Sequence, residues 1–234
     1  MKNLFTLVRI YVPPTIHDSK RHSTTHVVPD FVWNYVAENH KNWHIDGVKL
    51  LYMTHRHLQD DTSLIIDTKN SDLLADFLTG HIASLENVRG IHVINLAKMR
   101  FFRPPEESLD DFSRFTIAID VMPQNMNDLY EEISALKPGK DIFINYIANT
   151  FQSYDASILI SILARSRDHA EAFVNEYIRP LVGVMGTTIT LISKTMRLVT
   201  AEEWLESVGP FFFSPKGEHI RDIDARDDSL IAGC

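Results

Sequence analysis

The stretch Phe77-Leu78-Thr79-Gly80-His81-Ile82 returns in altered form as Phe173-Val174-Asn175-Glu176-Tyr177-Ile178, 96 residues further along the 234-residue chain. The same offset continues on both sides without a gap. It pairs Asp72 with Asp168, Leu85 with Leu181, Val88 with Val184, Gly90 with Gly186 and Lys98 with Lys194. Self-similarity at one fixed spacing indicates an internal duplication.

The two copies differ in length near their first strands. Phe5-Thr6 matches Phe115-Thr116, an offset of 110 instead of 96, so the first copy contains an insertion of about 14 residues. We assign the insertion to Pro13–Val28, which is rich in His, Ser, Thr and Pro, a composition typical of a loop.

Each copy is predicted to follow the order β-α-β-β-α-β. In the second copy Leu129, Ile133 and Leu136 recur at helical spacing, and Asn125 and Ser166 are expected to cap the two helices. Strands are expected at 4–12, 48–55, 62–67 and 91–100 in the first copy, and at 115–121, 142–148, 157–164 and 187–194 in the second. Helices are expected at 29–40 and 71–85 in the first copy, directly after Asn125 and Ser166 in the second, and at 201–208.

This order predicts an α+β fold of two tandem ferredoxin-like βαββαβ units. Each sheet would have a helix-free, apolar face, so we expect the units to pack sheet to sheet as a dimeric α/β barrel-like pseudo-dimer. The predicted divisions are a unit with a His-rich insertion at 1–102, a linker at 103–113, a second unit at 114–199, and a helix and mobile tail at 200–234. The cluster Phe211–Phe213 in this tail is expected to dock back or onto a partner.

Composition narrows the classes of function. The net charge is −8, and no run of basic residues is longer than Lys20-Arg21, so direct nucleic-acid binding is not expected. The single cysteine, Cys234, excludes a disulfide framework within one chain. No apolar run is long enough for a membrane span, and we expect a cytoplasmic protein with no membrane partner.

The second copy resembles the effector-binding (RAM) domain of the Lrp/AsnC transcriptional regulators. The resemblance rests on Leu129–Ile133, on Tyr154–Leu159, and on Phe173–Val184 followed by Thr187–Leu191. It implies a ferredoxin-like domain that forms a dimeric α/β barrel, binds a small-molecule effector and assembles into homo-oligomers. The chain departs from the family because the DNA-binding helix-turn-helix is replaced by the first copy.

The resemblance also implies a ligand site. The family binds amino-acid effectors at the turn between the second and third strands and at the start of the last strand. These positions correspond to Ser153, Tyr154 and Asp155 and to Thr187 and Thr188. The alternative is that Asp155 caps its own turn and that the threonines only fill an alternating strand.

Histidines are concentrated in the first quarter of the chain. Weak candidates for metal ligands, chosen by spacing, are His22, His26, His40, His44, His55 and His57. The alternative of solvated or packed histidines is favoured: no cysteine joins them, and His40 is expected to face the C-terminal end of its helix. We expect no metal and no cofactor.

The sequence contains no motif for nucleophilic or metal catalysis, and we assign no catalytic residue. We therefore predict a non-enzymatic regulatory or small-molecule-binding protein, with an amino acid as a possible effector. The alternatives are a structural pairing scaffold or an enzyme of the dimeric α/β barrel group, either like a cofactor-free monooxygenase or haem-handling. In the enzyme, His55, His57 or His92 would serve in the cleft.

Overall fold

The fold was analysed in a computed structural model, which describes residues 4–13, 15–18, 23–26, 30–43, 45–56, 61–102, 110–151 and 157–209. The chain divides into two compact units. Unit 1 consists of Met1–Asn95 and Ser193–Val199, and unit 2 of Leu96–Ile192 and Thr200–Cys234. The ends of two long strands therefore belong to a different unit from their beginnings.

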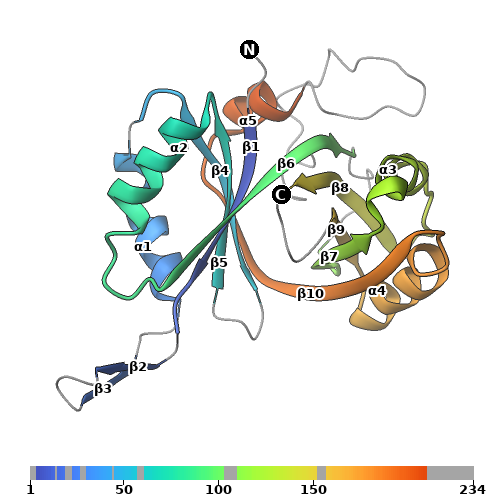
Figure 1. Ribbon diagram of the computed structural model, residues 1–234, viewed down its shortest axis with the longest axis horizontal. Helices are drawn as coiled ribbons and strands as arrows, with labels where there is room; N and C mark the ends of the chain where they lie inside the picture. The colour runs from blue at the N-terminus through green and yellow to red at the C-terminus, as the bar shows by residue number, and fades with distance from the viewer. Residues whose placement is uncertain are drawn as a thin grey trace. The chain divides into compact units, whose positions relative to one another are not determined.

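Unit 1 contains one antiparallel sheet with two helices on one face (Figure 1). Its strands are hydrogen-bonded in the order β6–β1–β5–β4–β10, with only the first part of β6 and the last part of β10 included. The elements are β1 (Leu4–Tyr11), β2 (Thr15–Asp18), β3 (Ser23–His26), α1 (Phe31–Asn39), η1 (His40–Asn42), β4 (Val48–Arg56), β5 (Asp61–Thr68), α2 (Ser71–Phe77), η2 (Leu78–Ile82) and β6 (Gly90–Phe101).

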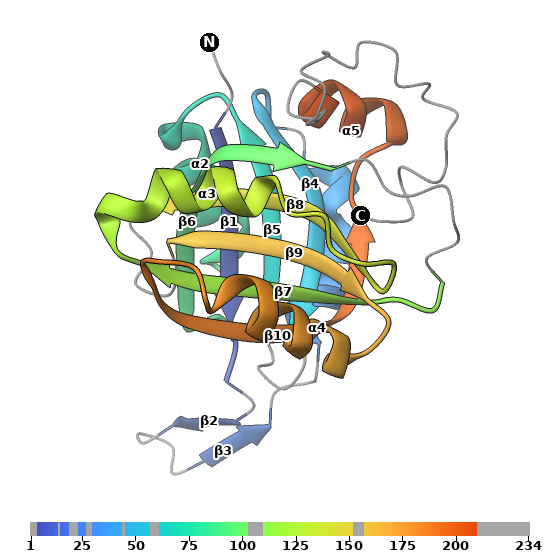
Figure 2. The ribbon, with the colours of Figure 1, turned by 90° about the vertical axis from the view of Figure 1, so that its right-hand side faces the viewer.

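Unit 2 repeats this design, and Figure 2 shows α3 and α4 across one face of its sheet. The strand order is β10–β7–β9–β8–β6, with the first part of β10 and the last part of β6. The elements are β7 (Ser113–Val121), η3 (Pro123–Asn125), α3 (Met126–Ser134), β8 (Ile142–Phe151), β9 (Ile158–Ala164), α4 (Arg167–Phe173), η4 (Val174–Ile178), β10 (Val184–Arg197) and α5 (Ala201–Val208).

The duplication predicted from the sequence is confirmed in detail by the second helix of each unit. α2 begins at Ser71 and α4 at Arg167, and both continue into a π-helical turn, at Leu78–Ile82 and Val174–Ile178, so every boundary differs by 96. Both helices begin after a side-chain cap, Asn70 in α2 and the predicted Ser166 in α4. A rare π-turn at the same place in both copies is difficult to explain without the duplication.

The alignment of the first strands was wrong by one residue. Leu4 pairs with Thr68, and Ser113 pairs with Ala164 in unit 2, so the offset is 113 minus 4, which is 109. Phe115 therefore corresponds to Thr6 rather than to Phe5. The match of identical residue types paired side chains that lie on opposite faces of the sheet. A shift of one residue has this effect because successive side chains of a strand point to opposite faces.

Two further local predictions were wrong. The segment Pro13–Val28, expected to be a loop, contains the hairpin β2–β3, in which Thr15 pairs with His26 and Asp18 with Ser23. Asn125 does not cap α3 with its side chain, because it ends the 3₁₀ turn that precedes the helix. The cluster Phe211–Phe213 and most of the linker lie outside the described residues.

Each unit has its own apolar core between helices and sheet. In unit 1 the core includes Val8, Ile10, Val36, Leu64 and Ile66, and in unit 2 it includes their counterparts on β7, β9 and α3. The opposite sheet face was expected to be apolar, and in unit 1 it is mixed. The strands alternate, so that the buried apolar residue Ile65 shares this face with Asp61, Ser63 and Asp67 of β5. Arg56 of β4 donates from Nε to Asp61 Oδ1 at 2.6 Å.

Candidate functional site

A polar cluster of unit 1 forms around Asp30, the residue before α1. Asp30 has a left-handed backbone (φ 60°), and its carboxylate makes no capping hydrogen bond to the helix. It contacts two strands instead: Oδ1 lies 3.3 Å from Nε2 of His55 on β4, and Oδ2 accepts a hydrogen bond from Nζ of Lys194 on β10. A left-handed conformation is costly for a residue with a Cβ, so packing must hold Asp30 in place.

His55 is the most buried titratable group of this cluster, with 8% of its surface exposed. It lies on the same strand face as Met53, which belongs to the core under α1. Ser193 Oγ donates to the main-chain oxygen of His55 at 3.1 Å, and the Trp33 ring lies edge to face with the imidazole, with 6.5 Å between the ring centroids. These contacts fix both the backbone and the plane of the ring.

The two imidazole nitrogens of His55 have different environments. Nε2 faces the carboxylate of Asp30, so we assign the ring proton to Nε2. Nδ1 is buried and has no hydrogen-bond partner among the described residues. A neutral imidazole of this tautomer presents an unshared electron pair at Nδ1.

Lys194 balances the charge of the carboxylate. Its ammonium pairs with Asp30 and lies 5.9 Å from the centre of the Trp33 ring. The positive end of α1 and the ammonium both attract the carboxylate of Asp30. An ionised carboxylate beside an imidazole orients the ring and stabilises the imidazolium that forms when Nδ1 takes a proton. The cluster is therefore suited to work as a general base.

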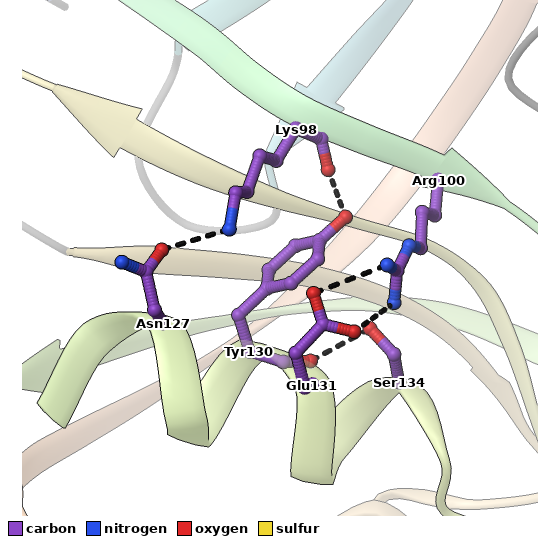
Figure 3. A network of polar contacts seen from close by, with 6 residues as sticks. All are labelled: Lys98, Arg100, Asn127, Tyr130, Glu131 and Ser134. Carbon is purple, nitrogen blue, oxygen red and sulfur yellow. Dashed lines mark hydrogen bonds and ion pairs between the residues drawn. The ribbon is translucent and has the colours of Figure 1, made fainter.

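Unit 2 contains a counterpart of this cluster on β6 and α3 (Figure 3). Lys98, the repeat partner of Lys194, donates from Nζ to Asn127 Oδ1 at 2.8 Å, and its Nζ lies 5.6 Å from the centre of the Tyr130 ring. Asn127 and Tyr130 are three residues apart, as are Asp30 and Trp33 in unit 1. Lys98 also has a left-handed backbone (φ 47°).

The counterpart of His55 is Asn149. His55 pairs with Thr62 across the ladder of unit 1, and Asn149 pairs with Ile158, which is Thr62 plus 96, across the ladder of unit 2. Asn149 is 1% exposed, and its Oδ1 also lacks a partner among the described residues. Both units thus place a buried, unpaired acceptor at one position.

Tyr130 in unit 2 is unsuited to act as a base. Its hydroxyl donates to the main-chain oxygen of Lys98, and burial raises the pKa of Tyr130 well above its ordinary value of 10.0. Arg100 lies 4.9 Å from the ring centre and donates two hydrogen bonds, of 2.8 and 3.1 Å, to Glu131 (Figure 3). These contacts tie α3 to β6, which is a structural role.

The effector residues predicted from the Lrp/AsnC resemblance are not brought together by the described structure. Ser153, Tyr154 and Asp155 lie outside the described residues. Thr187 accepts a hydrogen bond of 3.0 Å from Nε of Arg179, while Thr188 is exposed on the next position of the strand. Adjacent strand residues point to opposite faces, so the two hydroxyls do not form one site.

The six candidate metal histidines also separate. His22, His44 and His57 lie outside the described residues, and the side chain of His26 on β3 is not described. His40 Nδ1 lies 3.0 Å from the main-chain oxygens of Val36 and Ala37, at the end of α1, as expected. Within the described ranges, no three His, Cys, Asp or Glu residues are grouped so that they could hold a metal ion.

The sequence contains only a partial signal for the cluster of unit 1. His55 is among its candidates, and the pairing of Lys98 with Lys194 is visible in the repeat. Asp30 and Trp33 carry no such signal by themselves, because they fall within the first predicted helix. An offset of 97, which pairs Asp30 with Asn127 and Trp33 with Tyr130, is the signal in the sequence that points to them.

Comparisons with known proteins identify the fold. The sequence matches no family model, and no curated protein matches it. A Lactobacillus acidophilus NCFM structure, described as a "putative monooxygenase", is similar over 85% of this chain and 95% of its own, with 14% identity and a TM-score of 0.51. An anthrone oxidase-like protein is similar over 85% and 94%, with 12% identity and a TM-score of 0.50. These likenesses support the α+β class and no more than the fold.

No helix in the described part of the chain is both long and apolar enough to cross a membrane.

Proposed function

We propose that this protein is an enzyme of the dimeric α/β barrel group, in which His55 of unit 1 removes a proton from a bound substrate. The observation that carries the proposal is the buried His55, whose Nε2 lies 3.3 Å from Asp30 while Nδ1 has no partner among the described residues. Because Nδ1 is shielded from bulk water, proton transfer takes place with a bound molecule rather than with solvent.

The likenesses to proteins described as a "putative monooxygenase" and as anthrone oxidase-like support an oxidation by dioxygen as the reaction. Oxidation of an activated methylene by dioxygen, to a carbonyl group and water, begins with loss of a C–H proton. The resulting carbanion then gives its electrons to oxygen. A carboxylate–imidazole pair supplies the base for that first step. The haem-handling form of the enzyme stays a prediction.

The same proposal includes the finer expectations about assembly. The two units would pair sheet to sheet as a dimeric α/β barrel-like pseudo-dimer, and the whole chain would form homo-oligomers. The shared βαββαβ order of the units supports this arrangement.

Anthrone is a suitable probe because its methylene protons are acidic and its product differs in colour. Exchange of these protons into deuterium oxide, followed by NMR without oxygen, measures the base alone. We expect the protein to accelerate exchange and His55→Phe to lower the acceleration about 100-fold or more. Asp30→Asn keeps the side-chain shape and is expected to give a smaller loss.

The matched control is His92→Gln, which changes an exposed histidine of the same unit and should leave exchange unchanged. Equal exchange rates for the protein and His55→Phe would rule out the proposal, and so would the absence of any catalysed exchange. Oxygen uptake by the same variants then tests whether proton removal leads to oxidation.

Effector sensing at Ser153–Asp155 and Thr187–Thr188 stays a prediction, as does the relationship to the Lrp/AsnC effector domains. Thr187 is already engaged by Arg179. The likenesses to proteins described as a "putative monooxygenase" and as anthrone oxidase-like favour the enzyme over the sensor.

A further inference from the structure

The repeated clusters of the two units keep their lysine and change their chemistry. Asp30 of unit 1 corresponds to Asn127 of unit 2, and His55 corresponds to Asn149. In both units the lysine bonds to the side-chain oxygen at the start of the helix and lies near the ring three residues later. Unit 2 therefore keeps the two contacts of the lysine and has amides at the positions of the ionisable groups.

Asn149 has an unused hydrogen-bond acceptor in the interior. The residue is 1% exposed, and its Oδ1 has no donor among the described residues. A buried amide oxygen without a donor costs about 1–3 kcal/mol, and such atoms are rare unless a ligand or an ordered water supplies the hydrogen. The position is the one that the proposed base occupies in unit 1.

Lys98 lies beside Asn149 on the neighbouring strand. The contacts of Phe102 N with Asn145 O and of Phe101 with Tyr146 run in opposite directions along β6 and β8, which indicates antiparallel strands. Three residues further from Phe101 and Tyr146, in opposite directions, Lys98 lies about opposite Asn149. Both side chains lie on the helix side, since Lys98 reaches Asn127 of α3 and Asn149 shares its strand face with the core residue Ile147.

We propose that unit 2 contains a second, non-catalytic binding site, formed by Asn149, Lys98 and Asn127, for a small hydroxycarboxylate. The hydroxyl group donates to Asn149 Oδ1 at the buried end. The carboxylate accepts from the Lys98 ammonium at the exposed end, where Lys98 uses one of its three hydrogens for Asn127. The site thus has a buried neutral end and an exposed positive end.

The buried end selects a hydroxyl over an ammonium group. Asn149 is a neutral acceptor, and a buried ammonium without a negative partner is strongly unfavourable. Amino acids should therefore bind more weakly than hydroxy acids of the same size. Asn127 and Asn149 do not titrate, so the site binds without transferring a proton.

The test uses the full chain carrying His55→Phe, so that the site of unit 1 does not contribute. Glycolate, L-lactate and 4-hydroxybenzoate are the probes, with glycine as the amino-acid comparison. Affinities of the parent and of the variants are measured by isothermal titration calorimetry, and the bound probe is located by ¹H–¹⁵N NMR of the side-chain amide of Asn149, which is assigned from its loss in Asn149→Leu. We expect at least one hydroxy acid to shift this signal and to bind more tightly than glycine.

Two variants and one control decide the outcome. Asn149→Leu and Lys98→Met are each expected to weaken binding about tenfold or more, whereas the exposed Lys140→Met should leave it unchanged. Unchanged affinity in both site variants overturns the proposal. It is also overturned if no probe shifts the Asn149 signal, or if a crystal soaked with the best probe shows only water at Oδ1. Since His55 is absent throughout, the result is independent of the proposed enzyme activity.

Discussion

Asp30 combines a left-handed backbone with two side-chain contacts at the start of α1. Its left-handed conformation, its approach to His55 and its ion pair with Lys194 all depend on one side chain. Asn tolerates this conformation better than other residues with a Cβ, and its amide oxygen can still accept from the lysine. Charge and backbone effects can therefore be separated at this residue.

We expect Asp30→Ala to destabilise the protein by about 1–2 kcal/mol, because alanine loses the contacts with His55 and Lys194 and keeps a Cβ in a left-handed conformation. Asp30→Asn should lower the free energy of unfolding by less than Asp30→Ala. Asp30→Gly should also be less destabilising than Asp30→Ala, because glycine adopts the left-handed conformation without strain. Urea unfolding monitored by circular dichroism measures the free energy of unfolding of the three variants. Equal losses for Ala and Gly would show that the backbone at Asp30 is not strained.

Tyr130 gives a second prediction at this scale. Burial holds the neutral phenol, so the pKa of Tyr130 is raised above 10.0 in the folded state. Its contribution to stability is fully present below pH 10.0 and is lost as the pH rises from 10.0 through the folded value, because the unfolded chain ionises first.

Tyr130→Phe should lower the unfolding free energy at neutral pH by about 1 kcal/mol, since the Lys98 carbonyl loses its donor. The variant should also lose less stability than the parent above pH 10.0. Unfolding curves of both proteins over this pH range test the prediction, and parallel losses would contradict it.

The turn before β10 depends on a glycine. Gly183 has φ +98°, and a Cβ at this position would lie 2.6 Å from Cβ and Cγ of Asn125. The side chain of Asn125, predicted to be a cap, fills the space beside this turn instead. The element boundary is thus fixed by a close approach between two turns.

Gly183→Ala is expected to destabilise the protein by about 2 kcal/mol or more, from the left-handed backbone and the clash together. The matched control is Gly80→Ala in the π-turn of unit 1, where the added Cβ meets no atom within 4 Å. Alanine favours helix over glycine by about 0.5–1 kcal/mol, so this control should be neutral or stabilising. Thermal unfolding compares them, and equal effects would refute the argument.

Neither unit is a continuous piece of chain. Unit 1 needs Ser193–Val199, which pairs with β4, and unit 2 needs Leu96–Phe101, which pairs with β8. A cut in the linker at 103–113 therefore leaves each fragment without its fifth strand. An unpaired strand beside a buried core exposes main-chain donors and acceptors.

Fragments 1–102 and 103–234 should each fail to fold alone and should regain structure when they are co-expressed. Circular dichroism and amide exchange of the separate and mixed fragments measure this. A cooperative unfolding transition in either isolated fragment would show that the exchanged strand ends are dispensable. The intact chain is the control.

The sequence by itself predicted the duplication, the βαββαβ order within each copy and the residue at which the second helix of each copy begins. These follow from local patterns that the chain repeats at 96 residues. Only the tertiary structure decided the alignment of the first strands, because residue identity does not show which sheet face a side chain occupies. The residue pairs between β1 and β5 and between β7 and β9 show that the offset of the first strands is 109 rather than 110.

The site was decided by the tertiary structure for a related reason. Lys194 and Asp30 are 164 residues apart, and they meet because β10 ends beside β4 in unit 1. No periodicity within a segment encodes the pairing of distant strands, since it depends on the combined free energy of the whole sheet. The sequence supplied His55 and the two repeated lysines, and strand pairing placed one lysine beside an acid–base pair and the other beside two amides.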